Sequence, residues 1–221
     1  RPVIALLLIV LVISGFTSFD GLLSYPDNFP KPVYDFSKKP LTQAKIDLGH
    51  ALFYDPLLSR NNTISCSSCH SSYNAFAHVD HDLSHGINDQ IGTRNAPALM
   101  NLAWQKTFMW DGAVNHLDVQ ALAPISNEIE MAEDIGHIAK KLQATRLYPP
   151  LFYKAFGDSV ITGEHILLAL SQFQLTLISC HSKYDSVMQQ QAVFTPQEMQ
   201  GYALFKKHCS SCHQEPLFST Y

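Results

Sequence analysis

Cys66-Ser67-Ser68-Cys69-His70 occurs a second time as Cys209-Ser210-Ser211-Cys212-His213. Cys-x-x-Cys-His is the attachment signature of c-type haem, in which two thiols bind the porphyrin and the adjoining histidine offers a nitrogen to the iron. Two copies therefore predict two covalently bound haem c groups. Zinc binding and disulfide redox chemistry use the same residue types. However, the copies lie too far apart for a zinc finger or ribbon, and neither copy sits in a βαβ pattern.

The similarity between the two copies extends upstream. Gly49-His-Ala-Leu-Phe53 precedes the first motif and Gly201-Tyr-Ala-Leu-Phe205 precedes the second. Thr42 is expected to cap the first of these helices, and Thr195 the second, where Pro196 follows in a capping box. A repeat on this scale indicates two cytochrome c-like units. The small glycine of each helix is expected to allow a close helix crossing near the haem.

The rest of the chain has helical rather than alternating periodicity, and the predicted fold class is all-α. Besides the two capped helices, helices are predicted at 134–144, at 151–156 after a break at Pro149-Pro150, and at 164–179. The predicted architecture is two cytochrome c-like haem domains, of which the second is truncated at its C-terminus.

The composition of the chain and its turn-forming and helix-breaking residues divide it into five segments. Val3–Ile13 is an apolar run behind Arg1, too short to span a bilayer comfortably, and typical of an export signal. Export agrees with haem c attachment, which occurs outside the cytoplasm in bacteria, and predicts a periplasmic location. The segments are a signal remnant or N-terminal anchor at 1–18, an extended lead-in without regular structure at 19–41, an N-terminal haem domain at 42–184, a linker at 185–194 and the start of an incomplete second domain at 195–221.

The overall composition indicates a folded protein that does not bind nucleic acid. The 221 residues are 46% hydrophobic, which is enough for a packed core, and the net charge is −4. This charge predicts no attraction to nucleic acid. The fifth cysteine, Cys180, is interpreted as a buried thiol. The sequence does not determine the oligomeric state, and a homodimer is one option.

Polar groups of the kind that a redox enzyme needs lie between the motifs. In order they are His85-Gly86, Arg94-Asn95-Ala-Pro97, Trp110-Asp111-Gly112, Gln120 and Glu130-Met131. Together with Leu48-Gly49…Leu52-Phe53-x-Asp55-Pro56 and both haem motifs, their order and spacing resemble the bacterial di-haem cytochrome c peroxidase family, which includes MauG-like enzymes. The resemblance runs from about Leu41 to the end of the chain.

The resemblance implies a role for each matching position. The first haem is the peroxidatic one, attached through Cys66 and Cys69 with His70 as proximal ligand, and the 42–184 domain holds it. The second haem, at Cys209, Cys212 and His213, receives electrons from a small cytochrome c or a cupredoxin. The remaining matches are Glu130 as distal acid/base, Gln120 as distal amide, Trp110 between the haems, Asn95 at an interdomain calcium ion and His85 as a displaceable distal ligand.

Residue chemistry supports these roles and leaves alternatives open. Cleavage of peroxide requires a proton to move between its oxygens, which a nearby carboxylate can do, and burial would raise the pKa of Glu130. Arg94 either pairs with a haem propionate or is a surface arginine. His85 is either a haem ligand or a surface histidine. Without the haem motifs, Glu130 would be a solvated residue at a helix start and Trp110 a core residue.

The expected function is a periplasmic peroxidase that reduces hydrogen peroxide to water. One alternative is a MauG-like oxidase that acts on a partner protein or a small substrate. Another is a non-enzymatic di-haem electron carrier, whose irons would both be permanently six-coordinate. A last one is a fragment that lacks activity because its second domain is cut short.

Overall fold

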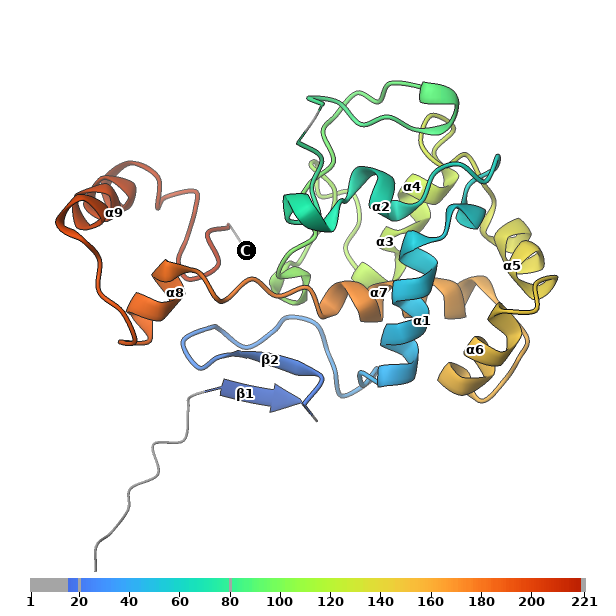
Figure 1. Ribbon diagram of the computed structural model, residues 1–221, viewed down its shortest axis with the longest axis horizontal. Helices are drawn as coiled ribbons and strands as arrows, with labels where there is room; N and C mark the ends of the chain where they lie inside the picture. Colours follow the sequence, from blue (N-terminus) through green and yellow to red (C-terminus); the bar gives the residue numbers. More distant parts are fainter. Residues whose placement is uncertain (1–15, 20, 80, 220–221) are drawn as a thin grey trace, which may run out of the picture.

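A computed structural model describes residues 16–19, 21–79 and 81–219, with side chains from residue 21 onward. Within these residues the chain is mostly helical and contains one small β-hairpin (Figure 1). Single helical turns of 3₁₀ type lie at Pro56–Leu58, Ser72–Asn74, Ile87–Asp89 and Leu102–Trp104. The α-helices are α1 (Gln43–Tyr54), α2 (Cys66–Cys69), α3 (Leu117–Gln120), α4 (Leu122–Ser126), α5 (Ile135–Gln143), α6 (Tyr148–Phe156), α7 (Gly163–Leu175), α8 (Lys183–Met188) and α9 (Pro196–His208).

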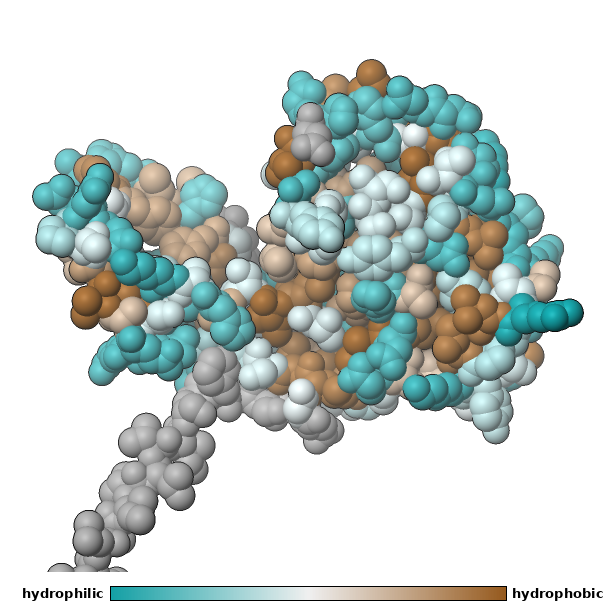
Figure 2. Space-filling view, viewed as in Figure 1, coloured by the Kyte–Doolittle hydropathy of each residue, from teal (hydrophilic) through white to brown (hydrophobic). Residues whose placement is uncertain are grey.

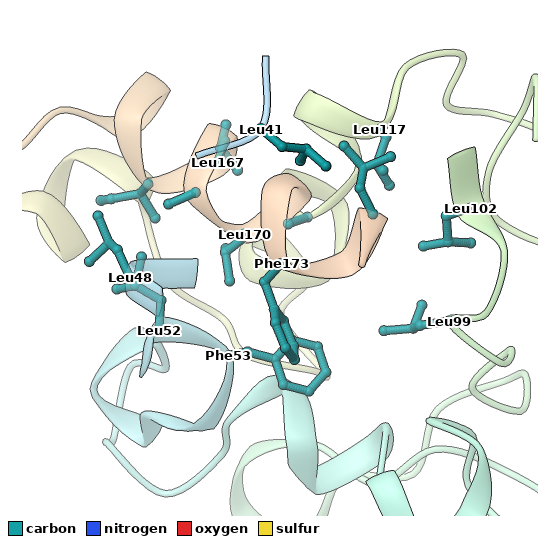
Figure 3. Packing of buried hydrophobic residues seen from close by; sticks show 14 of the residues in the cluster. Leu41, Leu48, Leu52, Phe53, Leu99, Leu102, Leu117, Leu167, Leu170 and Phe173 are labelled. Atoms are coloured by element: carbon teal, nitrogen blue, oxygen red, sulfur yellow. The ribbon is translucent and has the colours of Figure 1, made fainter. Parts of the chain in front are cut away.

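The crossing of α1 and α7 forms the centre of the larger body. These helices have the most extensive contact of any helix pair in the described part of the chain. A Cβ atom on Gly49 would lie 1.9 Å from the carbonyl oxygen of Ala169, so only glycine allows this approach. Figure 3 shows Phe53 and Phe173 packed together beside this crossing, with leucines from both helices around them. The predicted role of the first glycine is confirmed.

The lead-in contains regular structure, contrary to the sequence-based prediction. β1 (Phe16–Phe19) pairs antiparallel with β2 (Leu23–Pro26), and Gly21 with φ +75° lies in the turn. Leu23 and Tyr25 are buried. Tyr25 packs edge-on against Trp104 at 5.1 Å between ring centroids. The alternation of Leu23 and Tyr25 is the period-2 signal of a half-buried strand, but it is too short to be recognised without the aromatic surface that it covers.

A buried carboxylate fastens the lead-in to the helices. Asp118 of α3 accepts hydrogen bonds from the Tyr34 hydroxyl at 2.9 Å, the Lys39 ammonium at 2.5 Å and the Ser171 hydroxyl of α7 at 2.8 Å. These contacts join three parts of the chain that are distant in sequence. Asp118 stands two residues before Gln120, so the same anchor holds the end of α3 in place.

The ends of two helices differ from the prediction. Pro149 and Pro150 do not break the chain but lie in the first turn of α6, where a missing N–H costs nothing because that group has no partner inside the helix. α7 stops at Leu175, before the predicted end at 179, and the backbone N–H of Asn101 binds the Leu177 carbonyl oxygen beyond it at 2.9 Å.

After α7 the chain leaves the larger body and forms α8 and α9 to one side (Figure 1). α8 covers the first residues of the predicted linker at 185–194. It contacts the next segment through Lys183, which pairs with Glu198 of α9, and through Tyr184, whose hydroxyl binds Glu215 at 2.7 Å. Hydrophobic and polar residues are mixed over the face shown in Figure 2.

None of the helices in the described residues is both long and apolar enough to cross a membrane. The apolar run at Val3–Ile13, on which the predictions of a signal segment and an anchor depend, lies outside the described residues. Residues 16–18 of that segment belong to β1.

Candidate functional site

The first Cys-x-x-Cys-His motif forms a single helical turn. Cys66–Cys69 is α2, and the side chain of Ser68 accepts a hydrogen bond from the Ser65 backbone N–H at 3.1 Å. Both cysteines are free thiols that line one cavity. Burial raises the pKa of Cys66 to about 12 and also raises the pKa of Cys69. Two protonated thiols one turn apart are positioned for attachment to one porphyrin.

The local backbone fixes the orientation of His70. Its Nδ1 lies 2.9 Å from the carbonyl oxygen of Phe76, which leaves Nε2 as the nitrogen that can bind iron. Ala75 and Phe76 have φ values of 55° and 56°, a left-handed conformation that is costly for residues other than glycine. Burial lowers the pKa of His70, which favours the neutral ring that a metal requires.

A cavity of about 440 Å³ opens beside this motif. Cys69 and His70 line it, together with Gln120 and Glu130. A smaller cavity shares these four residues and extends to Cys66. The structure thus brings the two predicted distal residues to the same cavity as the first haem motif.

Glu130 lies in the turn between α4 and α5 and is half-buried. Burial raises the pKa of its carboxyl group, and a hydrogen bond from Asn127 Nδ2 to Oε1, at 2.7 Å, opposes the rise. A raised carboxyl pKa favours the exchange of a proton near neutral pH. Gln120 is the last residue of α3, and its Nε2 lies 3.6 Å from the Met109 sulfur.

His85 lies at the edge of the smaller cavity. Its Nδ1 is 2.7 Å from Asp89 Oδ1, which leaves Nε2 for a ligand role, and its side chain is 28% exposed. Its ring also stands 4.4 Å from that of His81. No group of three or more His, Cys, Asp or Glu residues that could hold a metal ion occurs among the described residues. The position next to the cavity is compatible with a distal ligand.

Arg94, Asn95 and Trp110 form the rim of the larger cavity. Arg94 pairs with Asp111 at 2.8 Å. Asn95 donates its amide to the carbonyl oxygens of His78 and His81, which leaves the amide oxygen as the atom that could meet a cation. The indole N–H of Trp110 donates to the Asn95 carbonyl oxygen at 2.7 Å, and 63% of this tryptophan is exposed.

The second motif repeats one detail of the first. Cys209, Cys212 and His213 are exposed, and they follow α9. The Nδ1 of His213 lies 3.1 Å from the carbonyl oxygen of Phe218, which has φ 54°. A histidine oriented by a left-handed phenylalanine carbonyl therefore occurs at both motifs.

Gln174 was not among the predicted site residues. This α7 residue is 4% exposed and lines the smaller cavity, where its buried Oε1 has no hydrogen-bond partner in the described part of the chain. An unpaired buried acceptor costs free energy unless a ligand or water binds it. Two thiols, a neutral imidazole and this acceptor around one cavity fit a haem c group. A polar residue in the middle of an apolar helix was the only available signal.

Three comparisons with known proteins show which family the chain resembles. Residues 43–193 match the family model of di-haem cytochrome c peroxidases. The chain is 34% identical to the methylamine utilization protein MauG of Methylorubrum extorquens, over 85% of this chain and 53% of the relative. It is 36% identical to a cytochrome c551 peroxidase of Nitrosomonas europaea, over 77% of this chain and 51% of the relative. The chain therefore spans about half the length of these curated relatives.

Solved structures show the same similarity. A MauG-like protein associated with microbial copper homeostasis matches with a TM-score of 0.79 at 32% identity, over 88% of this chain and 59% of that chain. The diheme peroxidase BthA of Burkholderia thailandensis matches with a TM-score of 0.67 at 28% identity, over 78% of this chain and 49% of that chain.

Proposed function

Because this chain belongs to the di-haem cytochrome c peroxidase family, we propose that its protein reduces hydrogen peroxide to water. The single observation that carries the proposal is the shared cavity, which Glu130 and Gln120 line together with Cys69 and His70 of the first haem motif. An electron carrier needs no proton-transfer group at its iron, whereas peroxide reduction does. This contrast favours an enzyme over a carrier.

Residues of this chain would bind the first haem and transfer the proton during peroxide reduction. Cys66, Cys69 and His70 would hold the haem, which supplies the redox chemistry when bound. Glu130 takes the proton from one peroxide oxygen and returns it to the oxygen that leaves as water. Gln120 offers amide hydrogens that orient the peroxide. Arg94 is proposed to pair with a propionate, and His85 to fill the distal site until it is displaced.

The second haem motif is proposed to hold the group through which electrons enter the protein. Cys209, Cys212 and His213 would hold the second haem, which receives electrons from a small cytochrome c or a cupredoxin. Trp110 would lie on the path between the haems, and Asn95 would contribute to a calcium site between the domains. The proposal places the protein in the periplasm, and a homodimer is a further part of it.

The test is the substitution Glu130→Gln in the haem-loaded, full-length protein. Removal of the proton-transfer group should lower peroxide turnover by about 10²- to 10⁴-fold, while haem content stays unchanged. Glu128→Gln is the matched control, because Glu128 is an exposed carboxylate in the same turn. Wild-type turnover in Glu130→Gln would contradict the assignment.

A MauG-like oxidase is the second candidate. Its support is the identity with MauG and the similarity to a MauG-like structure. The two functions differ in where the electrons come from. A peroxidase consumes peroxide only with a reduced electron donor, whereas the oxidase draws its electrons from a partner protein or small substrate, which becomes oxidised. Peroxide consumption measured with and without a reduced cytochrome c distinguishes them.

A further inference from the structure

Asn127 holds together the tight turn that carries Glu130. Its main-chain oxygen accepts hydrogen bonds from the backbone N–H groups of Glu130, at 3.0 Å, and Ala132, at 2.9 Å. Its side-chain Oδ1 accepts another from the N–H of Ile129 at 3.2 Å. These three bonds form the turn, and any residue at position 127 that kept them would maintain the fold of the turn.

A fourth contact goes beyond the turn. Asn127 Nδ2 donates to Oε1 of Glu130 at 2.7 Å. The donor fixes one carboxyl oxygen and leaves Oε2 for the cavity. The same side-chain amide bonds the Ile129 N–H and the Glu130 carboxyl group. The orientation of the carboxyl group is therefore tied to the backbone of the turn.

Among the described residues, no side chain other than Asn127 hydrogen-bonds the Glu130 carboxyl group. The 85–87 segment contacts the Glu130 backbone: Ile87 N–H binds the Glu130 carbonyl oxygen at 2.8 Å, and a Cβ on Gly86 would lie 2.6 Å from the Glu130 Cα. The other carboxylates of the turn are engaged elsewhere, since Glu128 pairs with Arg60 and Glu133 pairs with Lys141.

We propose that Asn127 is the positioning residue of the distal acid, and that its amide orients the Glu130 carboxyl group towards the cavity. The inference rests on the proposed role of Glu130 in peroxide reduction. Asn127 also lines the larger cavity, but the proposal concerns its contact with Glu130. Asn127 acts through the carboxyl group that it holds.

Two substitutions separate the positioning role from the turn-forming role. Asn127→Asp keeps an oxygen acceptor for the Ile129 N–H but replaces the donor that faces Glu130. Asn127→Ala removes both side-chain contacts. Glu128→Gln serves as control because it alters an exposed side chain of the same turn. All variants are compared as haem-loaded, full-length protein with matched haem content and helical circular dichroism.

The first measurement is infrared spectroscopy of the Glu130 carboxyl group, whose bands are identified by their loss in Glu130→Gln. The second is the kcat and KM for peroxide. Asn127→Asp and Asn127→Ala should both shift the carboxyl bands. They should also lower kcat about 10- to 100-fold, which corresponds to one hydrogen bond to a charged group, with KM within about twofold. The control should behave as wild type.

Other outcomes would overturn the inference. Wild-type bands and kcat in Asn127→Asp, with a defect only in Asn127→Ala, would make Asn127 a turn former and nothing more. A band shift without a change in kcat would show that the orientation does not matter for turnover. Should Glu130→Gln retain full turnover, the proposed function fails instead, whereas the infrared comparison still tests the contact between the two side chains.

Discussion

Two glutamines on one helix, two residues apart, show how residues of the same type can have different tasks. Gln172 is fully buried and satisfied: its Oε1 accepts from the Thr42 N–H at 3.2 Å, and its amide donates to the Lys39 and Pro40 carbonyl oxygens. Gln174 is buried with its Oε1 unpaired at the cavity. The first connects α7 to the lead-in, and the second presents an acceptor atom at the cavity of the first haem motif.

This contrast predicts opposite results for Gln172→Leu and Gln174→Leu. Gln172→Leu leaves the Thr42 N–H without a partner and should lower the free energy of unfolding by about 1–3 kcal/mol. Gln174→Leu removes an unpaired acceptor, so stability without haem should not fall. In the haem-loaded protein, Gln174→Leu should change the reduction potential of the first haem, whereas Gln172→Leu should not. Thermal unfolding and potentiometric titration measure these effects. A shift in potential from Gln172→Leu alone would contradict the assignment.

Sequence periodicity could predict the position of the two glutamines but not the difference between them. It predicted a helix over 164–179 and placed both glutamines inside that helix. It could not separate them, because the partners of Gln172 come from the lead-in, about 130 positions earlier in the chain. Glu130, Gln120 and His70 were predicted as site residues because their motifs can be recognised in the sequence alone. Asn127 and Gln174 were missed because their contacts depend on the folded turn and cavity.

At the level of elements, the two helices that precede the haem motifs share a pattern but differ in packing. Gly49 of α1 lies against the Ala169 carbonyl oxygen of α7. Gly201 of α9 has nothing within 4 Å of the position that a Cβ would occupy. The caps at Thr42 and Thr195 form as predicted, since capping depends on neighbouring residues alone. The hairpin was not predicted, and Pro149-Pro150 was wrongly predicted to break the chain, because both depend on what the segment packs against or follows.

The pair Gly49→Ala and Gly201→Ala should therefore have opposite effects. In α1 the new methyl group would overlap a backbone oxygen that cannot rotate away, and overpacking of this kind costs about 1–3 kcal/mol or more. In α9 the same change should stabilise the helix by up to about 1 kcal/mol, because alanine has the better helix propensity. Thermal unfolding of both variants, followed by circular dichroism, measures the difference. Equal effects would mean that the α1–α7 crossing relaxes without cost.

At the scale of the whole molecule, the described chain has a larger body built on α1 and α7 and a smaller part with α8 and α9 (Figure 1). One carboxylate ties the smaller part together. Glu215 Oε1 accepts hydrogen bonds from Tyr184 of α8 at 2.7 Å and from Tyr202 of α9 at 2.5 Å. Burial and this carboxylate raise the pKa of Tyr202 to about 12 and also raise the pKa of Tyr184, so both hydroxyls remain protonated donors at neutral pH.

The position of Glu215, two residues after His213, gives the two tyrosines a joint role: they hold α8, α9 and the second haem loop as one unit. Tyr184→Phe combined with Tyr202→Phe removes both donors and retains the two rings, which pack on each other, while that of Tyr184 also packs on Phe218. Hydrogen exchange should then accelerate in α8 and α9, while the amides of α1 and α7 keep their wild-type rates, because local opening follows separate cooperative units. Lys183→Gln is the control, since its exposed ion pair with Glu198 contributes little. Faster exchange in α1 and α7 as well would show that the chain unfolds as a single unit and that α8 does not belong with the second haem motif.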